Sequence, residues 1–398
     1  MKVLQVNCVY KKGSTGKIVY DIHTGLRERG VVSVVCYGRG AKISEPHVYK
    51  TCGELYSKFN HLLTWITGMK YGGCLFSTGR LIAVIKKEKP DVVHLQCING
   101  YFVNIYRLTR WLKRNHIKTL LTLHAEFMYT ANCAHALECE KWKTGCGNCP
   151  RHRKECGALF WDGTARAWRR MQAAFAGFEE DCTVVSVSPW LMERAKQSPI
   201  LRDFHHETVL NGIDTQIFCP REGTVLREWY GLKGKAVALH VTADFSMDPD
   251  HIKGGWYVVE LAKRMPEVTF VVIGSRQPMS DLPDNVLNIG WVEDQNELAA
   301  WYSAADVTLL TSKKETFSMI VAESICCGTP VVGFRAGAPE MIALPEWSEF
   351  VEHGDLNALE RALSETAQKK QYGSETQSNQ HYSKEKMIAE YDRIYRAI

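Results

Sequence analysis

The chain lacks several features that would place it in other protein classes. None of its apolar runs reaches 18 residues, so we expect no membrane-spanning helix. Its first residues, MKVLQVNCVY, form a short strand pattern and not a signal peptide. It has no internal repeat and no low-complexity tract. The 14 cysteines, without a secretion signal, are typical of a reducing compartment, so we expect a cytoplasmic protein whose thiols are free or bound to metal.

A length of 398 residues is too great for one ordinary core and predicts two domains. Charge differs between the two halves. Up to Leu210 there are 31 Lys and Arg against 17 Asp and Glu, whereas from Asn211 onward there are 18 against 27. A basic N-terminal half favours an anionic partner, such as a bilayer surface, a lipid diphosphate or nucleic acid. The alternative is an uneven surface charge without function.

Apolar, β-rich runs alternate with helical stretches through both halves. The predicted strands cover residues 3–9, 31–37, 92–95, 119–123, 184–187, 236–241, 268–273, 286–289, 307–310 and 330–334. Continuous Val, Ile and Leu runs between helices are typical of parallel sheets covered on both faces. The sequence therefore predicts an α/β protein with two doubly wound, Rossmann-like domains, residues 1–210 and 211–383, that bind ligands beyond the carboxyl ends of their strands.

The segment 313–340 places two carboxylates, Glu315 and Glu323, eight residues apart at a loop-to-helix junction. The helix start at Phe317, Ser318 and Met319 would offer unpaired N–H groups and a positive dipole end to an anion. Two carboxylates that can accept ligand hydroxyls, placed around backbone amides that can bind phosphate, suit a sugar nucleotide. A solvated, charged helix edge is the alternative interpretation.

This block resembles the E-x7-E signature of family 4 of the retaining, GT-B-fold glycosyltransferases. The segments NGID (211–214), IKGG (252–255), VVIGS (271–275) and GWVEDQNELAAWYSAADVTLL (290–310) resemble the same family and occur in its order. The resemblance implies a GT-B architecture, in which an acceptor-side and a nucleotide-sugar domain face a central cleft. It also implies that a last helix, residues 384–398, returns to the first domain.

Two N-terminal segments match family positions. In KKGSTG, after the first strand, Gly13, Ser14, Thr15 and Gly16 stand where the family has a Gly pair that approaches phosphate, although a plain strand–helix turn would look the same. We expect the following helix at residues 17–29. His124 ends a strand where the family often has His-Asp, and the resemblance implies that it approaches the donor sugar. Here the Asp is missing, and whether Glu126 replaces it is open.

The C-terminal matches concern the donor. The resemblance implies that Lys253 neutralises the diphosphate leaving group; the family's upstream Arg is absent, so Arg276 is the candidate for a second charge. It implies Glu323 on the ribose hydroxyls and Glu315 on the sugar hydroxyls. The candidates near the base are Gly274, Ser275 and Val292. We expect no catalytic metal, because we find no Asp-x-Asp candidate in the expected cleft.

A cysteine cluster is the second distinctive feature. Cys133, Cys139, Cys146 and Cys149 follow the pattern C-x5-C-x6-C-x2-C, which can close around tetrahedral zinc. Free or redox-active thiols and an iron–sulfur cluster are the alternatives. The loop resembles one in glycosyltransferases of colanic-acid-type exopolysaccharide assembly.

A mixed aromatic, basic and apolar segment covers residues 56–76. It fits either a helix in a membrane interface or a buried amphipathic helix that covers the sheet.

Together these features predict a retaining glycosyltransferase that moves a sugar from a nucleoside diphosphate, with UDP expected, to a lipid-linked saccharide of undecaprenyl diphosphate type. We expect it in the cytoplasm, peripheral on the inner face of an anionic membrane, in surface or exopolysaccharide assembly. The rival interpretations are another GT-B-fold enzyme, such as a sugar-nucleotide epimerase, and a zinc-stabilised nucleic-acid-binding protein. On the main interpretation nucleic acid is not a partner.

Overall fold

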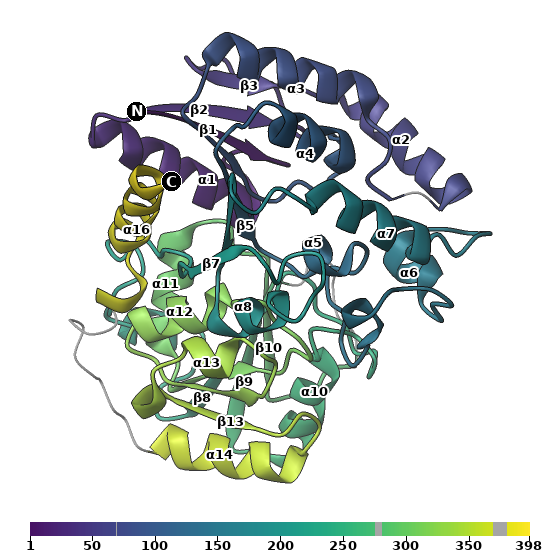
Figure 1. Cartoon of the computed structure of the whole chain (residues 1–398). Helices are drawn as coiled ribbons and strands as arrows, with labels where there is room; N and C mark the ends of the chain where they lie inside the picture. The colour runs from purple at the N-terminus through teal and green to yellow at the C-terminus, as the bar shows by residue number, and fades with distance from the viewer. Residues whose placement is uncertain (69, 275–280, 369–379) are drawn as a thin grey trace. The chain divides into compact units, whose positions relative to one another are not determined.

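The computed structural model describes residues 1–68, 70–274, 281–368 and 380–398. The chain forms two compact units, one of Met1–Leu210 with Met387–Ile398 and one of Asn211–Lys386 (Figure 1). None of the described helices is long and apolar enough to cross a membrane.

The first unit contains a seven-stranded sheet in the order β3-β2-β1-β4-β5-β6-β7, in which every neighbouring pair is parallel. Its strands are β1 (Lys2–Asn7), β2 (Val32–Tyr37), β3 (Val48–Lys50), β4 (Val92–Leu95), β5 (Thr119–Leu123), β6 (Cys182–Ser186) and β7 (His205–Thr208). The central strands are apolar because helices cover both faces. The strand order reverses between β1 and β4, which is where doubly wound sheets bind ligands.

The helices of this unit include one that comes from the far end of the chain. They are α1 (Gly13–Glu28), α2 (Glu54–Thr67), α3 (Leu75–Glu88), α4 (Ile105–Arg114), α5 (Phe127–Thr130), η1 (Lys141–Lys143), α6 (His152–Cys156), α7 (Thr164–Phe175), α8 (Pro189–Ala195) and most of α16 (Lys384–Ala397). The predicted start of α1 at Lys17 was wrong by one turn, because Gly13 to Gly16 are already helical.

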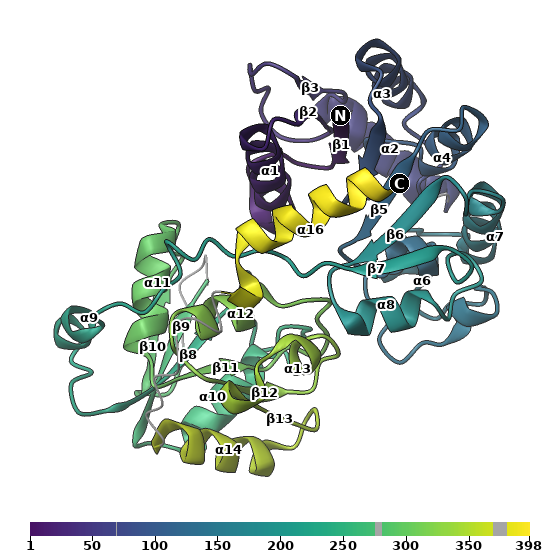
Figure 2. The same ribbon diagram turned by 60° about the vertical axis from the view of Figure 1, so that its left-hand side comes forward.

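Helix α16 is held beside α1 by apolar packing, and Figure 2 shows the two helices together. A Cβ on Gly25 of α1 would lie 2.5 Å from Cδ1 of Ile388, so a larger residue there would force the Ile388 side chain to shift. The hydroxyl of Tyr395 lies 2.7 Å from Nδ1 of His94, whose Nε2 lies 2.7 Å from the Thr122 hydroxyl. Both nitrogens of His94 are therefore engaged in the core, which gives this histidine a structural role.

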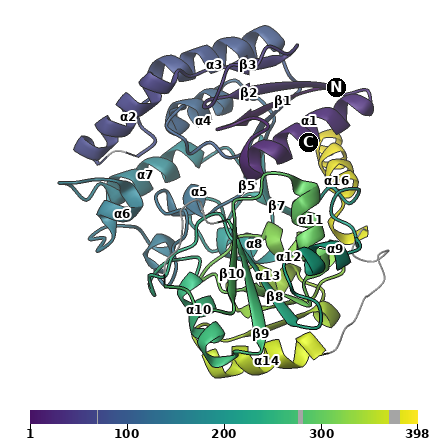
Figure 3. The same cartoon turned by 180° about the vertical axis from the view of Figure 1, so that it is seen from behind.

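The second unit contains a six-stranded parallel sheet in the order β10-β9-β8-β11-β12-β13. Its strands are β8 (Ala236–Val241), β9 (Val268–Ile273), β10 (Val286–Gly290), β11 (Val307–Leu310), β12 (Val331–Phe334) and β13 (Ser348–Val351). Its helices are α9 (Thr224–Trp229), α10 (Gly255–Arg264), α11 (Gln295–Ala304), α12 (Met319–Cys326), α13 (Pro339–Ile342), η2 (Pro345–Trp347) and α14 (Leu356–Gln368). Helices α10 and α14 bury one face of this sheet (Figure 3). The predicted fold class is confirmed, since both units are parallel-sheet α/β folds.

Candidate functional site

The second unit joins two of the predicted site residues by an ion pair. Nζ of Lys253, just before α10, donates to Oε1 of Glu315 over 2.6 Å, and the two side chains are 30% and 14% exposed. The loop before α10 and the loop after β11 are held together, because the Lys313 amide donates to the Ile252 carbonyl over 2.8 Å and the Thr311 hydroxyl donates to the Lys253 carbonyl over 3.1 Å. Gly254 allows this contact: its φ is +67°, and a Cβ there would lie 2.1 Å from the Thr311 carbonyl oxygen. A cation and a carboxylate therefore share one half-buried position.

The turn after β12 fixes Glu315 from the other side. The Glu315 amide donates to the Ala336 carbonyl over 2.9 Å, and its own carbonyl accepts from the Ala338 amide over 3.2 Å. Glu340 holds the turn, because its carboxylate accepts from the amides of Ala336 and Gly337. Glu340 was not among the predicted site residues, although it closes the same sequence block.

Ser318 has the features of an anion-binding position. It directly precedes α12 and adopts a φ of +84°, which is rare for a residue with a side chain. Its Oγ is buried and has no hydrogen-bond partner in the described residues. Phe317 is buried beside it, and Met319 begins the helix. A strained backbone, an unpaired hydroxyl and a helix N-terminus at one point fit a phosphate or another anion.

Glu323 lies on α12 and is oriented by a residue that the sequence did not point to. The hydroxyl of Tyr302, on α11, donates to Oε2 of Glu323 over 3.1 Å. Burial, followed by the charge of Glu323, holds the pKa of Tyr302 well above its usual range. The phenol therefore stays protonated, and it fixes one oxygen of a half-buried carboxylate that could accept hydroxyl groups from a ligand with the other lone pairs.

The candidates near the base are only partly described. Gly274 directly follows β9 with a φ of +117°, and a Cβ there would lie 1.5 Å from the Thr242 carbonyl oxygen, so no other residue fits. Its amide donates to the Gly290 carbonyl over 2.7 Å, which brings it near half-buried Val292. Ser275 and Arg276 lie outside the described residues.

The sequence analysis did not single out one pair of neighbouring acidic residues. Asp248 and Asp250 form an Asp-x-Asp pattern before α10, and both are exposed. The Asp250 amide donates to the Asp248 carboxylate over 2.9 Å. Within the described residues no group of three or more His, Cys, Asp or Glu side chains is placed to hold a metal ion.

In the first unit, the glycine-containing segment forms the first turn of α1 directly after β1. Gly13 and Ser14 are exposed, Thr15 is half-buried and Gly16 is buried against Val9. In the described part of the chain, the side chain of the N-cap residue Lys12 makes no capping hydrogen bond at this helix start. Its amide groups are therefore available to an anionic ligand or to water.

His124 follows β5 and belongs to a polar chain across three strands. Its Nε2 lies 3.1 Å from Oε1 of Gln96, and Nε2 of Gln96 donates to Oε1 of Gln5 over 2.7 Å. Burial lowers the pKa of His124 to about 4. The imidazole is therefore neutral at pH 7, with Nε2 donating to the glutamine oxygen, and it would act on a ligand as a hydrogen-bonding group and not as a cation.

Glu126 does not take the place of the family's aspartate as a ligand. It is fully buried and accepts from the Tyr129 hydroxyl, the Ala136 amide and Nε of Arg194, at 2.5, 2.6 and 2.8 Å. The Arg194 guanidinium also lies 5.0 Å from the centre of the Trp142 ring. Glu126 is therefore the anchor of the cysteine-rich loop.

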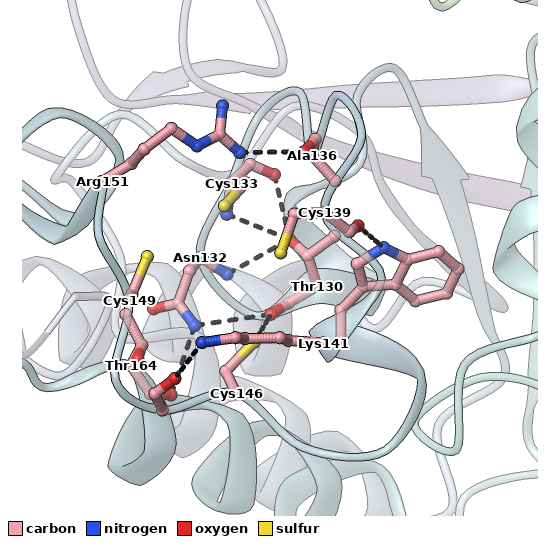
Figure 4. Close-up of a pocket in the computed structure, with 12 residues that line it drawn as sticks. Thr130, Asn132, Cys133, Ala136, Cys139, Lys141, Cys146, Cys149, Arg151 and Thr164 are labelled. Carbon is pink, nitrogen blue, oxygen red and sulfur yellow. Dashed lines mark hydrogen bonds between the residues drawn. The ribbon is translucent and has the colours of Figure 1, made fainter.

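The four predicted metal ligands surround one small pocket. Cys133, Cys139, Cys146 and Cys149 all line it, and its volume of about 20 Å³ accommodates a single water-sized particle (Figure 4). Burial, with smaller effects from Cys139 and Cys149, raises the pKa of Cys146 to about 12. The four cysteines share this pocket, but in the described residues they do not form a coordination shell. Zinc binding stays a prediction.

Comparison with known proteins identifies the class. Residues 253–369 match the family model of Glycosyl transferases group 1, a segment that contains Lys253, Glu315, Ser318 and Glu323. Over its full length the fold is that of GT-B enzymes. It is similar to that of a sucrose-phosphate synthase from Thermosynechococcus elongatus, with a TM-score of 0.70 and 16% identity over 100% of this chain and 98% of that one. Residues 253–369 are thus matched as a glycosyl transferase group 1 domain, within a chain that has the GT-B fold.

Two further relatives are informative. The chain is 22% identical to a putative colanic acid biosynthesis glycosyl transferase, WcaC of Escherichia coli, over 99% of both chains. It also matches Anabaena Alr3699/HepE, solved in complex with UDP and glucose, with a TM-score of 0.63 and 14% identity over 100% of both chains. The predicted family resemblance is confirmed.

Proposed function

We propose that this protein is a retaining hexosyltransferase that uses a nucleoside diphosphate sugar, with UDP as the nucleotide, and extends a lipid-linked saccharide in polysaccharide assembly. The observation that carries the proposal is the Lys253–Glu315 pair in the same domain as the α12 N-terminus. It supplies a cation for a leaving diphosphate and a carboxylate for sugar hydroxyls. The UDP-bound relative and the colanic acid relative support the donor and the pathway class.

In this proposal the donor occupies the second unit. Glu323, oriented by Tyr302, accepts the ribose hydroxyls, and the region of Gly274 and Val292 receives the base. The unpaired Ser318 hydroxyl and the α12 amides bind the diphosphate. Lys253 exchanges its carboxylate partner for a phosphate oxygen, which frees Glu315 to accept a hydroxyl of the transferred sugar. Arg276 is the proposed second cation.

The proposed chemistry is front-face displacement. The acceptor oxygen forms a bond to the anomeric carbon while the bond from that carbon to the diphosphate oxygen breaks, and the acceptor proton passes to the departing phosphate. Lys253 and the helix N-terminus stabilise the charge that develops on that phosphate. Neutral His124, whose Nε2 donates to Gln96, accepts a hydrogen bond from a sugar hydroxyl at Nδ1, and residues Gly13 to Gly16 contact phosphate. The chemistry assigned to these residues includes no metal-bound step.

The proposed acceptor is a saccharide on undecaprenyl diphosphate, presented at the inner face of the cytoplasmic membrane. The excess of Lys and Arg before Leu210 supports an anionic partner of the first unit. We propose structural zinc only for the cysteine loop, whose four cysteines line one pocket.

The test is transfer of radiolabelled sugar from UDP-sugars to undecaprenyl diphosphate-linked saccharides, with the anomeric configuration of the product determined by NMR. Transfer with retention supports the proposal. Conversion of the donor to another sugar nucleotide without any acceptor would identify an epimerase instead. No reaction with any donor, combined with salt-dependent binding of DNA or RNA, would favour the nucleic-acid interpretation.

A further inference from the structure

Helix α2 presents its apolar side chains outward. Its buried residues are polar: Ser57, Asn60 and Thr64. Ser57 donates to the Gly100 carbonyl, and the Asn60 oxygen accepts from the Cys74 amide over 2.7 Å. The opposite face is exposed and apolar, with side chains at the i, i+4, i+7, i+8 and i+11 positions of one helix face, namely Leu55, Phe59, Leu62, Leu63 and Ile66. The sequence alternative of a buried apolar face is wrong.

Neighbouring segments extend this apolar surface at both ends of α2. At the C-terminal end, the Leu159 amide donates to the Trp65 carbonyl over 3.1 Å, and Phe160 and Trp161 beside it are 72% and 68% exposed. At the N-terminal end, the Phe76 amide donates to the Tyr56 hydroxyl, and Phe76 is 79% exposed. A continuous exposed patch of this kind marks an interaction surface.

A basic pocket continues the surface along α3 and α4. It has a volume of about 360 Å³, and no carboxylate is among its lining residues, which are Ile82, Lys86, Arg107, Arg110, Trp111 and Arg114. Nη1 of Arg107 donates to the Leu75 carbonyl over 3.1 Å, so the pocket adjoins the exposed start of α3. Nζ of Lys86 lies 5.9 Å from the centre of the Trp111 ring. Figure 1 shows α2, α3 and α4 as neighbours in the first unit.

The charges on these three helices are almost all positive. They carry eight Lys and Arg residues and two carboxylates, Glu54 and Glu88. Both carboxylates already have cationic partners, Glu54 with Arg39 and Glu88 with Lys2. An apolar helix face beside cations that no carboxylate neutralises in the described residues is the combination that binds anionic membranes. The apolar residues enter the headgroup region while the cations meet lipid phosphates.

We propose that α2, the 159–161 segment and the α3–α4 basic pocket form one docking surface for an anionic lipid bilayer, with a headgroup phosphate in the pocket. A protein partner would complement the cations with carboxylates at fixed positions. A second copy of this surface would place eight cations against eight more, which disfavours self-association. The inference deepens the proposed function, since it rests on a lipid-linked acceptor and names where the membrane is contacted.

The test is co-sedimentation of the full chain with vesicles of phosphatidylcholine alone or with 30% phosphatidylglycerol. We expect at least ten-fold tighter binding to the anionic vesicles, weakened by salt. Phe59→Gln with Leu62→Gln should weaken binding at least ten-fold. Arg107→Gln with Arg110→Gln and Arg114→Gln should remove the preference for phosphatidylglycerol.

Matched controls lie in the second unit. Val225→Gln with Trp229→Gln removes two apolar side chains that are 52% and 78% exposed, and Lys233→Gln with Lys235→Gln and Lys263→Gln removes three charges. Both sets should bind within two-fold of the parent. The inference is overturned if the parent ignores anionic vesicles, if docking and control variants bind alike, or if sedimentation reveals a dimer broken by the α2 variant. Donor-induced thermal shifts, measured on the same variants, report separately on the proposed function.

Discussion

Lys253 and Glu315, 62 positions apart, meet through a 2.6 Å hydrogen bond between Nζ and Oε1. The pair keeps the Lys253 cation half-buried and the Glu315 carboxylate oriented before any ligand binds. In a nucleotide sugar the diphosphate would pair with the cation and the sugar hydroxyls with the carboxylate. A preorganised cation of this kind stabilises developing charge with little reorganisation.

Replacing Lys253 should affect the chemical step most strongly. Lys253→Ala should lower kcat by about 100- to 1,000-fold with a smaller change in the KM for the donor, because the leaving phosphate gains most of its charge in the transition state. Lys263→Ala, on the exposed side of α10, is the control and should leave both constants unchanged. A loss of donor affinity at unchanged kcat would show that Lys253 does not stabilise the leaving group.

Glu126 should matter for stability. Glu126→Ala leaves the Arg194 guanidinium, only 14% exposed, without its carboxylate, and breaking a buried pair in this way costs about 3–5 kcal/mol. Urea unfolding would measure the change. Glu140→Gln is the control, since Glu140 is 54% exposed and 3.9 Å from the same arginine, and should change stability by less than about 0.5 kcal/mol. Equal effects of the two substitutions would refute the anchoring role.

Acid should destabilise the protein through His240. This buried side chain bonds to the Leu309 carbonyl through Nδ1, and its Nε2 has no partner in the described residues. Burial lowers its pKa from 6.5 to about 4. The unfolded chain therefore takes up a proton below pH 6.5 that the folded chain accepts only near pH 4, so stability falls as pH drops through this window.

From pH 7.5 to 5.0 this histidine should account for about 2 kcal/mol of the lost unfolding free energy. His240→Asn keeps a donor near the carbonyl and does not titrate, so urea unfolding at the two pH values should show a smaller difference than in the parent. An unchanged pH dependence would show that folding does not shift the pKa of His240.

The cysteine loop should contain zinc. Protein purified without added metal should carry about one zinc per chain by elemental analysis, as expected for a four-thiolate site. Cys146→Ser should remove most of it, whereas Cys219→Ser, in the second unit, should not. The prediction would be contradicted if the purified protein contained no zinc and a chelator did not change its unfolding. The four cysteines would then be free thiols.

The central strands could be predicted because a parallel strand buried on both faces must be apolar along its length. Five of them, including residues 92–95 and 307–310, have the predicted bounds. Three strands were missed: β3, β7 and β13 lie at sheet edges, and β7 reads His-His-Glu-Thr. Edge strands are partly covered, and the sequences of these three carry no continuous apolar run.

Sequence pattern could not orient side chains between distant segments. The periodicity of α2 defined an apolar face without indicating that it points outward, because the inward face is satisfied by hydrogen bonds of Ser57 and Asn60. Tyr302 lay inside a quoted family segment, yet its link to Glu323 depends on how α11 packs against α12. Glu126 looked like a ligand candidate, and its three buried partners could be found only from the fold.

Donor binding tests the account most directly. Thermal unfolding of the purified protein should be measured with UDP-, GDP-, dTDP- and ADP-sugars, alongside Glu323→Ala and the control Glu360→Ala on α14. The account predicts that the UDP series raises the Tm by several degrees in the parent and the control, and that this shift is lost in Glu323→Ala. No shift with any nucleotide sugar, or an equal shift in Glu323→Ala, would contradict the assignment of the donor site.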